Sequence, residues 1–589
     1  MSDPIDNQEA GQPLAGGIWQ FLWKHGDFPL IELKILVITF AILYVSAHAT
    51  LHRPPSAQPR KKGAKTALDD DENEEDDEEP SNIGGLQPSD AIVFPIMASI
   101  ALVGMYYVIQ YLRSAEILNM VMRCYTSVVS VGSLITLYSH GLQLATSIIF
   151  PRYWRARNGT IYFVDQATRR HYVWEEDKPI KDQEGLNMPL GPLPCSVAAL
   201  CLPLQTRASL WELRGLLTEK WILEIKLHGI LNEKMPLRFS HGLAALMSVA
   251  TIIAYNFTNS ALLSNIMGLA FCYATQQLLS PTTFVTGSLV LVGLFFYDIV
   301  MVFYTPFMLT VATQVDAPVK LTIKTGSRSN LLGLGDIVIP GIMVALSLRF
   351  DLWMHYQRKV RYVPADVMTN SETSKGSQSS QLIRPGHLRS VAKREQYSEV
   401  MGTWGDWLWT SSFLAPFRSY PRPPSVHSAS FPKPYFYASL TGYALGMGFT
   451  MTMLMVFKHG QPALLYLVPG LIGALLLTGF VRGEIREMLV YNEDGSLDVE
   501  DVEVELDKNG RLFRFILPEQ TEESKKEVDE GGESRSNKQK TKEVSTMGKS
   551  TGIEAGVIGG RQRSDVLLIR ISAPIPEVDE NAPSKLDEL

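Results

Sequence analysis

The sequence predicts an all-α membrane protein that crosses the bilayer about nine times. The averages alone, 46% hydrophobic and 20% charged residues over 589 positions, would suit a soluble protein. The apolar residues are clustered, however, and the charges lie between the clusters. A spanning helix needs about 20 consecutive apolar residues, whereas strands of a membrane barrel would give short alternating segments. The long runs in this chain therefore predict spanning helices.

Nine runs have this length and character, and each is expected to form one helix. Glu32 and Lys34 interrupt the first run, so its apolar core should begin near Ile35. The runs cover residues 29–51, 91–113, 117–138, 238–258, 261–280, 283–305, 331–350, 434–457 and 462–482.

The positive charges beside these runs predict the orientation of the chain, because Lys and Arg are enriched on the cytosolic side. With nine spans, the basic segments after spans one, three, seven and nine all fall on one side. The N-terminus is then lumenal and the C-terminus cytosolic. Segment 313–330 runs against this rule, because it carries Lys320, Lys324 and Arg328 but is placed in the lumen. With no cleavable signal peptide at the N-terminus, the first run is expected to stay as an anchor.

The spans divide the chain into seven regions. The soluble regions are distinguished by their polar or low-complexity composition. The regions are a lumenal N-terminus (1–28), helices one to three with an acidic cytosolic linker at 52–90 (29–150), a cytosolic loop (151–237), helices four to seven (238–350), a flexible cytosolic loop (351–433), helices eight and nine (434–482) and a largely disordered cytosolic tail (483–589).

Local patterns predict some structure inside the soluble regions. Residues 159–174 alternate around a turn, which is compatible with a β-hairpin, and residues 502–517 suggest another with its turn at Asn509-Gly510. Residues 210–227 read as an amphipathic helix at the membrane surface. The acidic run 69–79 is expected to be a solvated linker, with an acidic docking site as the alternative.

Several kinds of chemistry have no support in the sequence. The four cysteines are too few and too scattered for a disulfide framework. We find no His/Cys spacing typical of zinc, no phosphate-binding glycine loop and no basic–aromatic patch for nucleic acid. The sequence therefore predicts neither a metal, nor an organic cofactor, nor a nucleic-acid partner.

Two aspartates inside predicted spans are the strongest functional signal. An acid at the centre of a spanning helix costs about 2.5–3.5 kcal/mol on insertion scales, so it marks a functional site by default. Asp298 lies about 16 residues into its run, which is roughly 24 Å along a helix. Asp336 lies about five residues into the next, antiparallel run. Both should therefore lie in the lumenal half of the membrane and can meet.

A close pair of carboxyl groups in a site of low dielectric constant has a specific chemistry. Both groups cannot ionise cheaply, so one keeps its proton while the other is an anion, as in aspartic proteases. The anion can take a proton from water that attacks a peptide carbonyl, and the acid can protonate the carbonyl oxygen. Two other readings stay open at this point: a proton or ion path in a transporter or channel, and a docking site in a membrane-protein chaperone.

The residues around the acids favour a protease. Gly333 and Gly335 bracket Leu334 just before Asp336, and glycine lets another backbone approach closely. A protease needs such room, because a helical substrate must be extended before its carbonyls can be attacked and could then pair with exposed backbone. The alternative role of these glycines is tight helix packing.

Three motifs in order resemble the signal peptide peptidase family of intramembrane aspartyl proteases, which is related to presenilin. They are Tyr297-Asp298, GLGD at 333–336 and QPALL at 461–465, on spans six, seven and nine. The wider matches DAPVKL, GLGDIVIPG, LRFD and QPALLYLVPG favour signal peptide peptidase over presenilin, whose N-terminus would be cytosolic.

The resemblance implies a presenilin/signal peptide peptidase-like fold and an enzyme of the endoplasmic reticulum membrane. It would cleave membrane-spanning segments, namely remnant signal peptides and type II membrane proteins, without metal or cofactor. The family also allows a homo-oligomer. Asp298 and Asp336 carry over as the catalytic pair. The residues that would bind substrate or shape the site are Tyr297, Gly333, Leu334, Gly335, Gln461, Pro462, Ala463 and Leu464.

Overall fold

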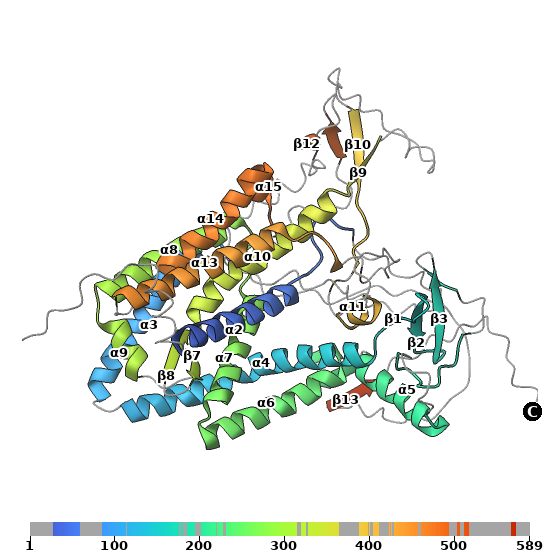
Figure 1. The fold of residues 1–589 in the computed structure, drawn as a ribbon, viewed down its shortest axis with the longest axis horizontal. Helices are drawn as coiled ribbons and strands as arrows, with labels where there is room; N and C mark the ends of the chain where they lie inside the picture. Colours follow the sequence, from blue (N-terminus) through green and yellow to red (C-terminus); the bar gives the residue numbers. More distant parts are fainter. Residues whose placement is uncertain are drawn as a thin grey trace, which may run out of the picture.

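The structure is a computed structural model, in which a bundle of long helices carries several small sheets (Figure 1). The residues that it describes are 27–58, 85–112, 115–175, 178–180, 185–194, 202–219, 221–227, 231–314, 320–325, 328–364, 388–398, 400, 404–411, 423, 426, 429–457, 461–493, 503–506, 512–516 and 567–572. The acidic run 69–79 and the predicted turn at Asn509-Gly510 lie outside them.

In the part of the chain that the structure describes, nine long helices correspond one to one with the nine predicted apolar runs. Seven of the described helices are long and apolar enough to cross a membrane, which confirms a polytopic α-helical membrane protein. Helices α7 and α13 are not among the seven, so the count of nine spans stays a prediction. The nine helices are α2 (Asp27–Ala49), α3 (Asp90–Leu112), α4 (Ala115–Ile149), α6 (Phe239–Thr258), α7 (Ala261–Leu278), α8 (Phe284–Phe303), α10 (Gly335–Gln357), α13 (Pro434–Phe457) and α14 (Leu464–Arg482).

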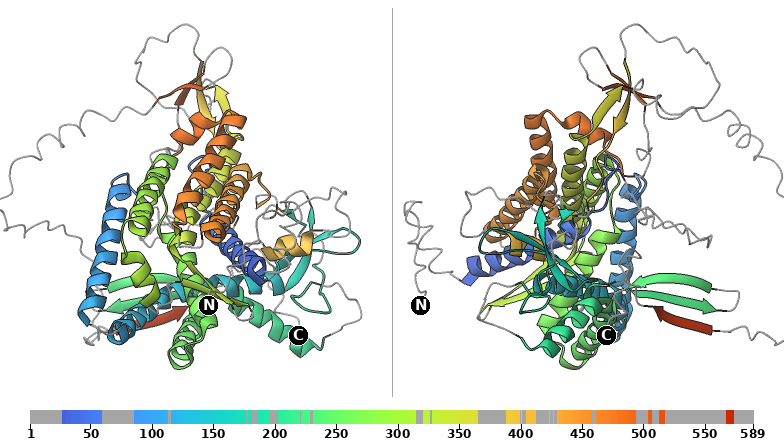
Figure 2. Two further views of the ribbon diagram at one scale, coloured as in Figure 1. Left: turned by 60° about the vertical axis from the view of Figure 1, so that its left-hand side comes forward. Right: turned by 90° about the vertical axis from the view of Figure 1, so that its right-hand side faces the viewer.

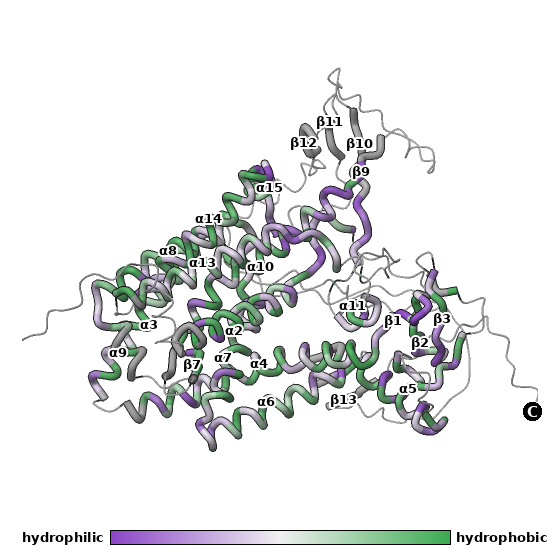
Figure 3. The backbone as a smooth tube through the Cα atoms, viewed as in Figure 1, coloured by the Kyte–Doolittle hydropathy of each residue, from purple (hydrophilic) through white to green (hydrophobic). Residues whose placement is uncertain are grey.

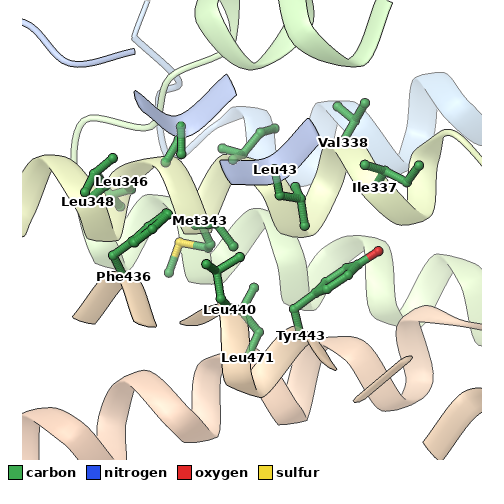
Figure 4. Packing of buried hydrophobic residues seen from close by; sticks show 14 of the residues in the cluster. Leu43, Ile337, Val338, Met343, Leu346, Leu348, Phe436, Leu440, Tyr443 and Leu471 are labelled. Atoms are coloured by element: carbon green, nitrogen blue, oxygen red, sulfur yellow. The ribbon is translucent and has the colours of Figure 1, made fainter. Parts of the chain in front are cut away.

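Helix α10 is the central element of the bundle. Its apolar window is 89% buried, whereas that of α3 is only 6% buried and must face lipid. Helices α2, α7, α8, α13 and α14 all pack against α10. A helix that is apolar on every side is typical of such a central position. Figure 4 shows the core that results, with Leu43 of α2, Met343 of α10 and Phe436 of α13 in one layer.

The predicted span at 331–350 is wrong at both ends. Helix α10 begins at Gly335 and continues to Gln357, and its predicted first residues form a strand instead. Strands β7 (Lys320–Thr325) and β8 (Arg328–Gly333) pair as an antiparallel hairpin that leads directly into α10. The short helix α9 (Phe307–Gln314) lies between α8 and this hairpin in sequence. Asp336 is therefore the second residue of its helix, not the fifth.

The loop after α4 contains two small sheets. Strands β1 (Tyr153–Arg155), β2 (Ile161–Asp165), β3 (Arg170–Glu175) and β4 (Lys178–Pro179) form an antiparallel sheet, and β2 and β3 make a hairpin where the sequence suggested one. Helix α5 (Leu204–Thr218) packs beside it. In Figure 3 this region alternates between hydrophilic (purple) and hydrophobic (green) stretches.

The predicted amphipathic helix 210–227 is only half helical. Helix α5 ends at Thr218, and strand β5 (Trp221–Leu227) follows and pairs with β6 (Leu231–Leu237). From Leu223 on, the residues LEIKL alternate apolar and charged side chains with a period of two, which favours a strand. Strand β13 (Leu567–Ser572) from the C-terminal tail adds to the outer edge of β5 (Figure 2, right).

The loop 351–433 and the tail 483–589 also contain regular structure, which the prediction of flexibility and disorder missed. Strands from both regions pair side by side across a long stretch of sequence. Helix α11 (Trp404–Thr410) packs against the end of α4. Its Asp406 side chain accepts hydrogen bonds there from the backbone N–H groups of Arg152 and Tyr153. The elements are β9 (Arg361–Pro364), β10 (Leu388–Lys393), α11 (Trp404–Thr410), α15 (Ile485–Val490), β11 (Glu503–Leu506) and β12 (Leu512–Ile516).

Candidate active site

Asp298 is held at the beginning of helix α14. Its side chain projects from α8 into the core, with only 5% of the residue exposed. The backbone N–H of Leu464, the first residue of α14, donates a hydrogen bond of 3.0 Å to Asp298 Oδ2. The first N–H groups of a helix have no partner within the helix and carry its positive dipole end. Asp298 therefore caps α14 from a neighbouring helix.

Asp336 approaches the same place from α10. It is the second residue of that helix and is half-buried, so its carboxyl lies near the positive end of its own helix dipole. Helices α8 and α10 pack against each other, and the carboxyl groups of Asp298 and Asp336 interact electrostatically. The structure thus brings the two intramembrane acids together, as their positions in antiparallel runs indicated.

The GLGD segment gives Asp336 its setting. A Cβ atom at Gly333 would lie 3.4 Å from Asp336 Oδ2, and one at Gly335 would lie 3.8 Å from Ile339. Both are van der Waals contacts, so crowding does not by itself require glycine at either position. Leu334 is buried, and its carbonyl accepts hydrogen bonds from the N–H groups of Ile337 and Val338. The small residue at 333 is therefore the one that lies directly beside the Asp336 carboxyl.

The QPAL segment forms the start of α14. Pro462 is buried and Ala463 is the N-cap of the helix, so these residues set where the N–H of Leu464 points. Gln461 accepts a hydrogen bond of 3.5 Å from the hydroxyl of Tyr466 on the first turns of α14. Tyr297 adjoins Asp298 in sequence and packs against the core of the bundle.

Two residues of this region had no signal in the sequence. Asn265 of α7 binds the outward edge of β7: its Nδ2 donates to the Thr322 carbonyl at 2.7 Å, and its Oδ1 accepts from the Thr322 N–H at 2.9 Å. Tyr443 of α13 donates from its hydroxyl to the backbone carbonyl of Asp336. Both are neutral residues within predicted spans, so only the tertiary structure identifies them.

The prediction that the protein uses no metal can be examined only for the described residues. Within the residues that the structure describes, no group of three or more His, Cys, Asp or Glu side chains could hold a metal ion.

The fold and this site define a class of protein: a polytopic membrane protein with two acids from adjacent helices meeting in its buried interior. Comparison with protein families then narrows the class. A profile described as signal peptide peptidase matches residues 78–495, which is well over half of the chain and includes all three motifs. The chain belongs to the signal peptide peptidase family.

Curated relatives agree with this assignment. The chain is 26% identical over 418 residues to signal peptide peptidase of Homo sapiens, a match that covers 69% of this chain and 74% of that protein. It is 31% identical over 254 residues to a probable intramembrane protease of Schizosaccharomyces pombe, covering 43% of this chain and 63% of the relative. Intramembrane protease 2 of Caenorhabditis elegans is 31% identical over 268 residues, or 44% of each chain. No solved structure matches.

Proposed function

We propose that this protein is an intramembrane aspartyl endopeptidase with Asp298 and Asp336 as its catalytic pair. The observation that carries the proposal is the meeting of two carboxyl groups inside the apolar bundle, one of them bonded to the N-terminus of α14. Family membership supports a protease, and a pair of acids is one chemistry by which a protein can hydrolyse a peptide bond without a metal.

The two carboxyl groups act as one unit. In the resting state they share one proton, because two anions this close in a low-dielectric site repel strongly. A water molecule between them loses a proton to the anion and attacks the substrate carbonyl carbon. The protonated carboxyl donates to the carbonyl oxygen, which gives a tetrahedral diol. Its collapse breaks the C–N bond as a proton moves to the leaving nitrogen.

The hairpin in front of Asp336 suggests how substrate is presented. A transmembrane helix hides its carbonyls in hydrogen bonds, so it must be extended before attack. The outward edge of β7 is occupied by Asn265, while β8 forms the other edge and leads through Gly333 to Asp336. A substrate strand that adds to β8 would bring its peptide bonds to the acids.

We assign the substrates, on family grounds, to remnant signal peptides and type II membrane segments in the endoplasmic reticulum membrane. The N-terminus is then lumenal and the C-terminus cytosolic. Gln461, Pro462, Ala463 and Leu464 orient Asp298, while Tyr297, Leu334 and the glycines of GLGD shape the site. A homo-oligomer is compatible with this assignment.

The test is cleavage of a signal-peptide-like transmembrane substrate by the purified protein in detergent, with products identified by mass spectrometry. Asp298→Asn and Asp336→Asn should each abolish cuts inside the apolar segment, because neither can complete the proton exchange. Pro462→Ala should lower the rate by displacing the N–H of Leu464.

Asp351 supplies a matched control. It is the other aspartate of α10 and is buried, 15 positions after Asp336 and so roughly 22 Å along the helix. Its carboxyl accepts hydrogen bonds from the N–H groups of Tyr435 and Phe436 at the start of α13. Asp351→Asn should keep activity. Cleavage that survives in Asp336→Asn would refute the pair, and a folded protein that binds but never cuts would indicate a chaperone-like role.

A further inference from the structure

Helix α10 contains a proline four residues after Asp336. In an α-helix each carbonyl accepts from the N–H four residues ahead, so the carbonyl of Asp336 should be paired by residue 340. Pro340 has no N–H and cannot make this bond. The first turn of the helix that carries the acid therefore lacks one of its internal hydrogen bonds. A buried carbonyl without a partner is unfavourable, so another donor is needed.

Tyr443 supplies that donor from a different helix. Its hydroxyl donates to the backbone carbonyl of Asp336 at 3.4 Å, and the tyrosine is fully buried. The ring also packs beside Phe40 on α2. Figure 4 shows the Tyr443 ring reaching from α13 toward the turn of α10 that carries Ile337. The phenol thus joins α2, α10 and α13 at the level of the acid.

We infer that Tyr443 is a positioning residue for Asp336: its hydroxyl replaces the backbone donor that Pro340 removes and so fixes the turn that aims the Asp336 carboxyl. This inference rests on the proposed function, in which Asp336 is one of the catalytic pair. A backbone turn with an unpaired carbonyl can rotate and so displace the carboxyl that it carries. A displacement of about 1 Å can strongly lower the rate of a reaction that depends on precise placement of its catalytic groups. Tyr443 does not touch substrate in this account.

The alternative is that Tyr443 is only a large core residue. Its ring packs beside Phe40, with ring centroids 6.3 Å apart, so its removal would leave a cavity. Tyr443→Phe separates the two roles because it keeps the ring and removes the hydroxyl. Loss of a single neutral hydrogen bond corresponds to about a threefold to tenfold effect. We expect that loss in kcat, with KM unchanged, because substrate binding does not involve the phenol.

A double-mutant cycle gives the decisive measurement. Pro340→Ala restores an N–H that can pair the Asp336 carbonyl within the helix, so the Tyr443 hydroxyl should become dispensable. We expect Tyr443→Phe to lower kcat less than about twofold in the Pro340→Ala protein, against about threefold to tenfold in the native sequence. Pro340→Ser restores the same N–H and is a second background if Pro340→Ala does not yield folded protein.

Controls separate this inference from the proposed function. Ser439 and Ser347 share a hydrogen bond of 2.9 Å that also joins α13 to α10, away from the acids, and Ser439→Ala should leave kcat unchanged. If Tyr443→Phe lowers kcat equally in both backgrounds, or not at all, the positioning role is overturned while the catalytic pair stands. Cleavage by Asp336→Asn would instead overturn the proposed function itself.

Discussion

Three aspartates of the helical bundle lie at helix N-termini. Asp298 and Asp351 each accept hydrogen bonds from the first N–H groups of a neighbouring helix, and Asp336 lies in the first turn of its own helix. The positive end of a helix stabilises an anion without adding a second charged side chain. This arrangement lets the three acids stay inside an apolar bundle.

His171 is a buried histidine on strand β3, outside the bundle, and it predicts how the stability of the protein depends on pH. Trp154 Nε1 donates to His171 Nδ1 at 3.0 Å, so the proton must be on Nε2, which donates to the Gly191 carbonyl at 2.9 Å. The ring is therefore neutral. Burial, with a smaller contribution from Arg214, lowers the His171 pKa from 6.5 to about 4 despite the bond to Gly191.

A lowered histidine pKa makes the unfolded chain bind more protons than the folded one between pH 6.5 and 4. Stability is therefore complete above pH 6.5 and falls as the pH drops toward 4, by about 3 kcal/mol for a shift of this size. Thermal unfolding of the native protein and of His171→Gln at pH 7.5 and 4.5 measures this loss of stability. At pH 7.5 the native protein should be more stable than His171→Gln, and the difference in stability between the two proteins should shrink at pH 4.5. A difference independent of pH would show that His171 does not titrate on unfolding.

At the scale of elements, one side chain of α7 bonds the backbone of the hairpin before Asp336. Asn265 makes two hydrogen bonds to the backbone of Thr322. Each contributes about 0.5–1.5 kcal/mol. Asn265→Ala should therefore loosen β7 and β8, increase hydrogen exchange of residues 320–333 and lower cleavage. Asn256 on α6 is the matched control, because its amide bonds only its own helix at Ile252. If Asn265→Ala and Asn256→Ala behave alike, the hairpin is held by other contacts.

The long helices could be predicted from the sequence because a run of about 20 apolar residues is a local signal. The acids could be predicted because a charge in such a run is costly. The β7–β8 hairpin was missed although the residues of β7 alternate, since the apolar run was assumed to begin at residue 331, inside β8. Tyr443 could not be found, because a tyrosine in a span has no distinctive cost and its partner is a backbone atom of another helix.

At the scale of the whole molecule, distant segments of the chain are joined outside the helical bundle. Strand β10 pairs with β11, and β5 with β13, although each pair is separated by more than a hundred residues. No local pattern in the sequence predicts such partners, because strand pairing depends on what the fold brings together. The tail is therefore connected to the rest of the protein at several points.

Glu493 joins the chain after α15 to the central helix. Its Oε1 accepts a hydrogen bond of 2.8 Å from Arg349 Nε, and their side chains are only 7% and 4% exposed. The Tyr491 hydroxyl donates to the same oxygen, and the Glu493 N–H donates to the Thr282 carbonyl. Removing one partner of a buried pair leaves an unpaired charge, which costs about 3–5 kcal/mol.

Glu493→Ala should therefore lower the thermal unfolding midpoint strongly. The exposed pair of Arg169 and Glu212, at 2.6 Å, is the control, because a surface pair contributes less than about 1 kcal/mol. Glu212→Ala should change the midpoint little. Replacing both buried partners, as Arg349→Met with Glu493→Leu, should cost less than Glu493→Ala alone, since no charge is left unpaired. If Glu493→Ala is as mild as Glu212→Ala, the segment after α15 is not part of the bundle that fixes α10.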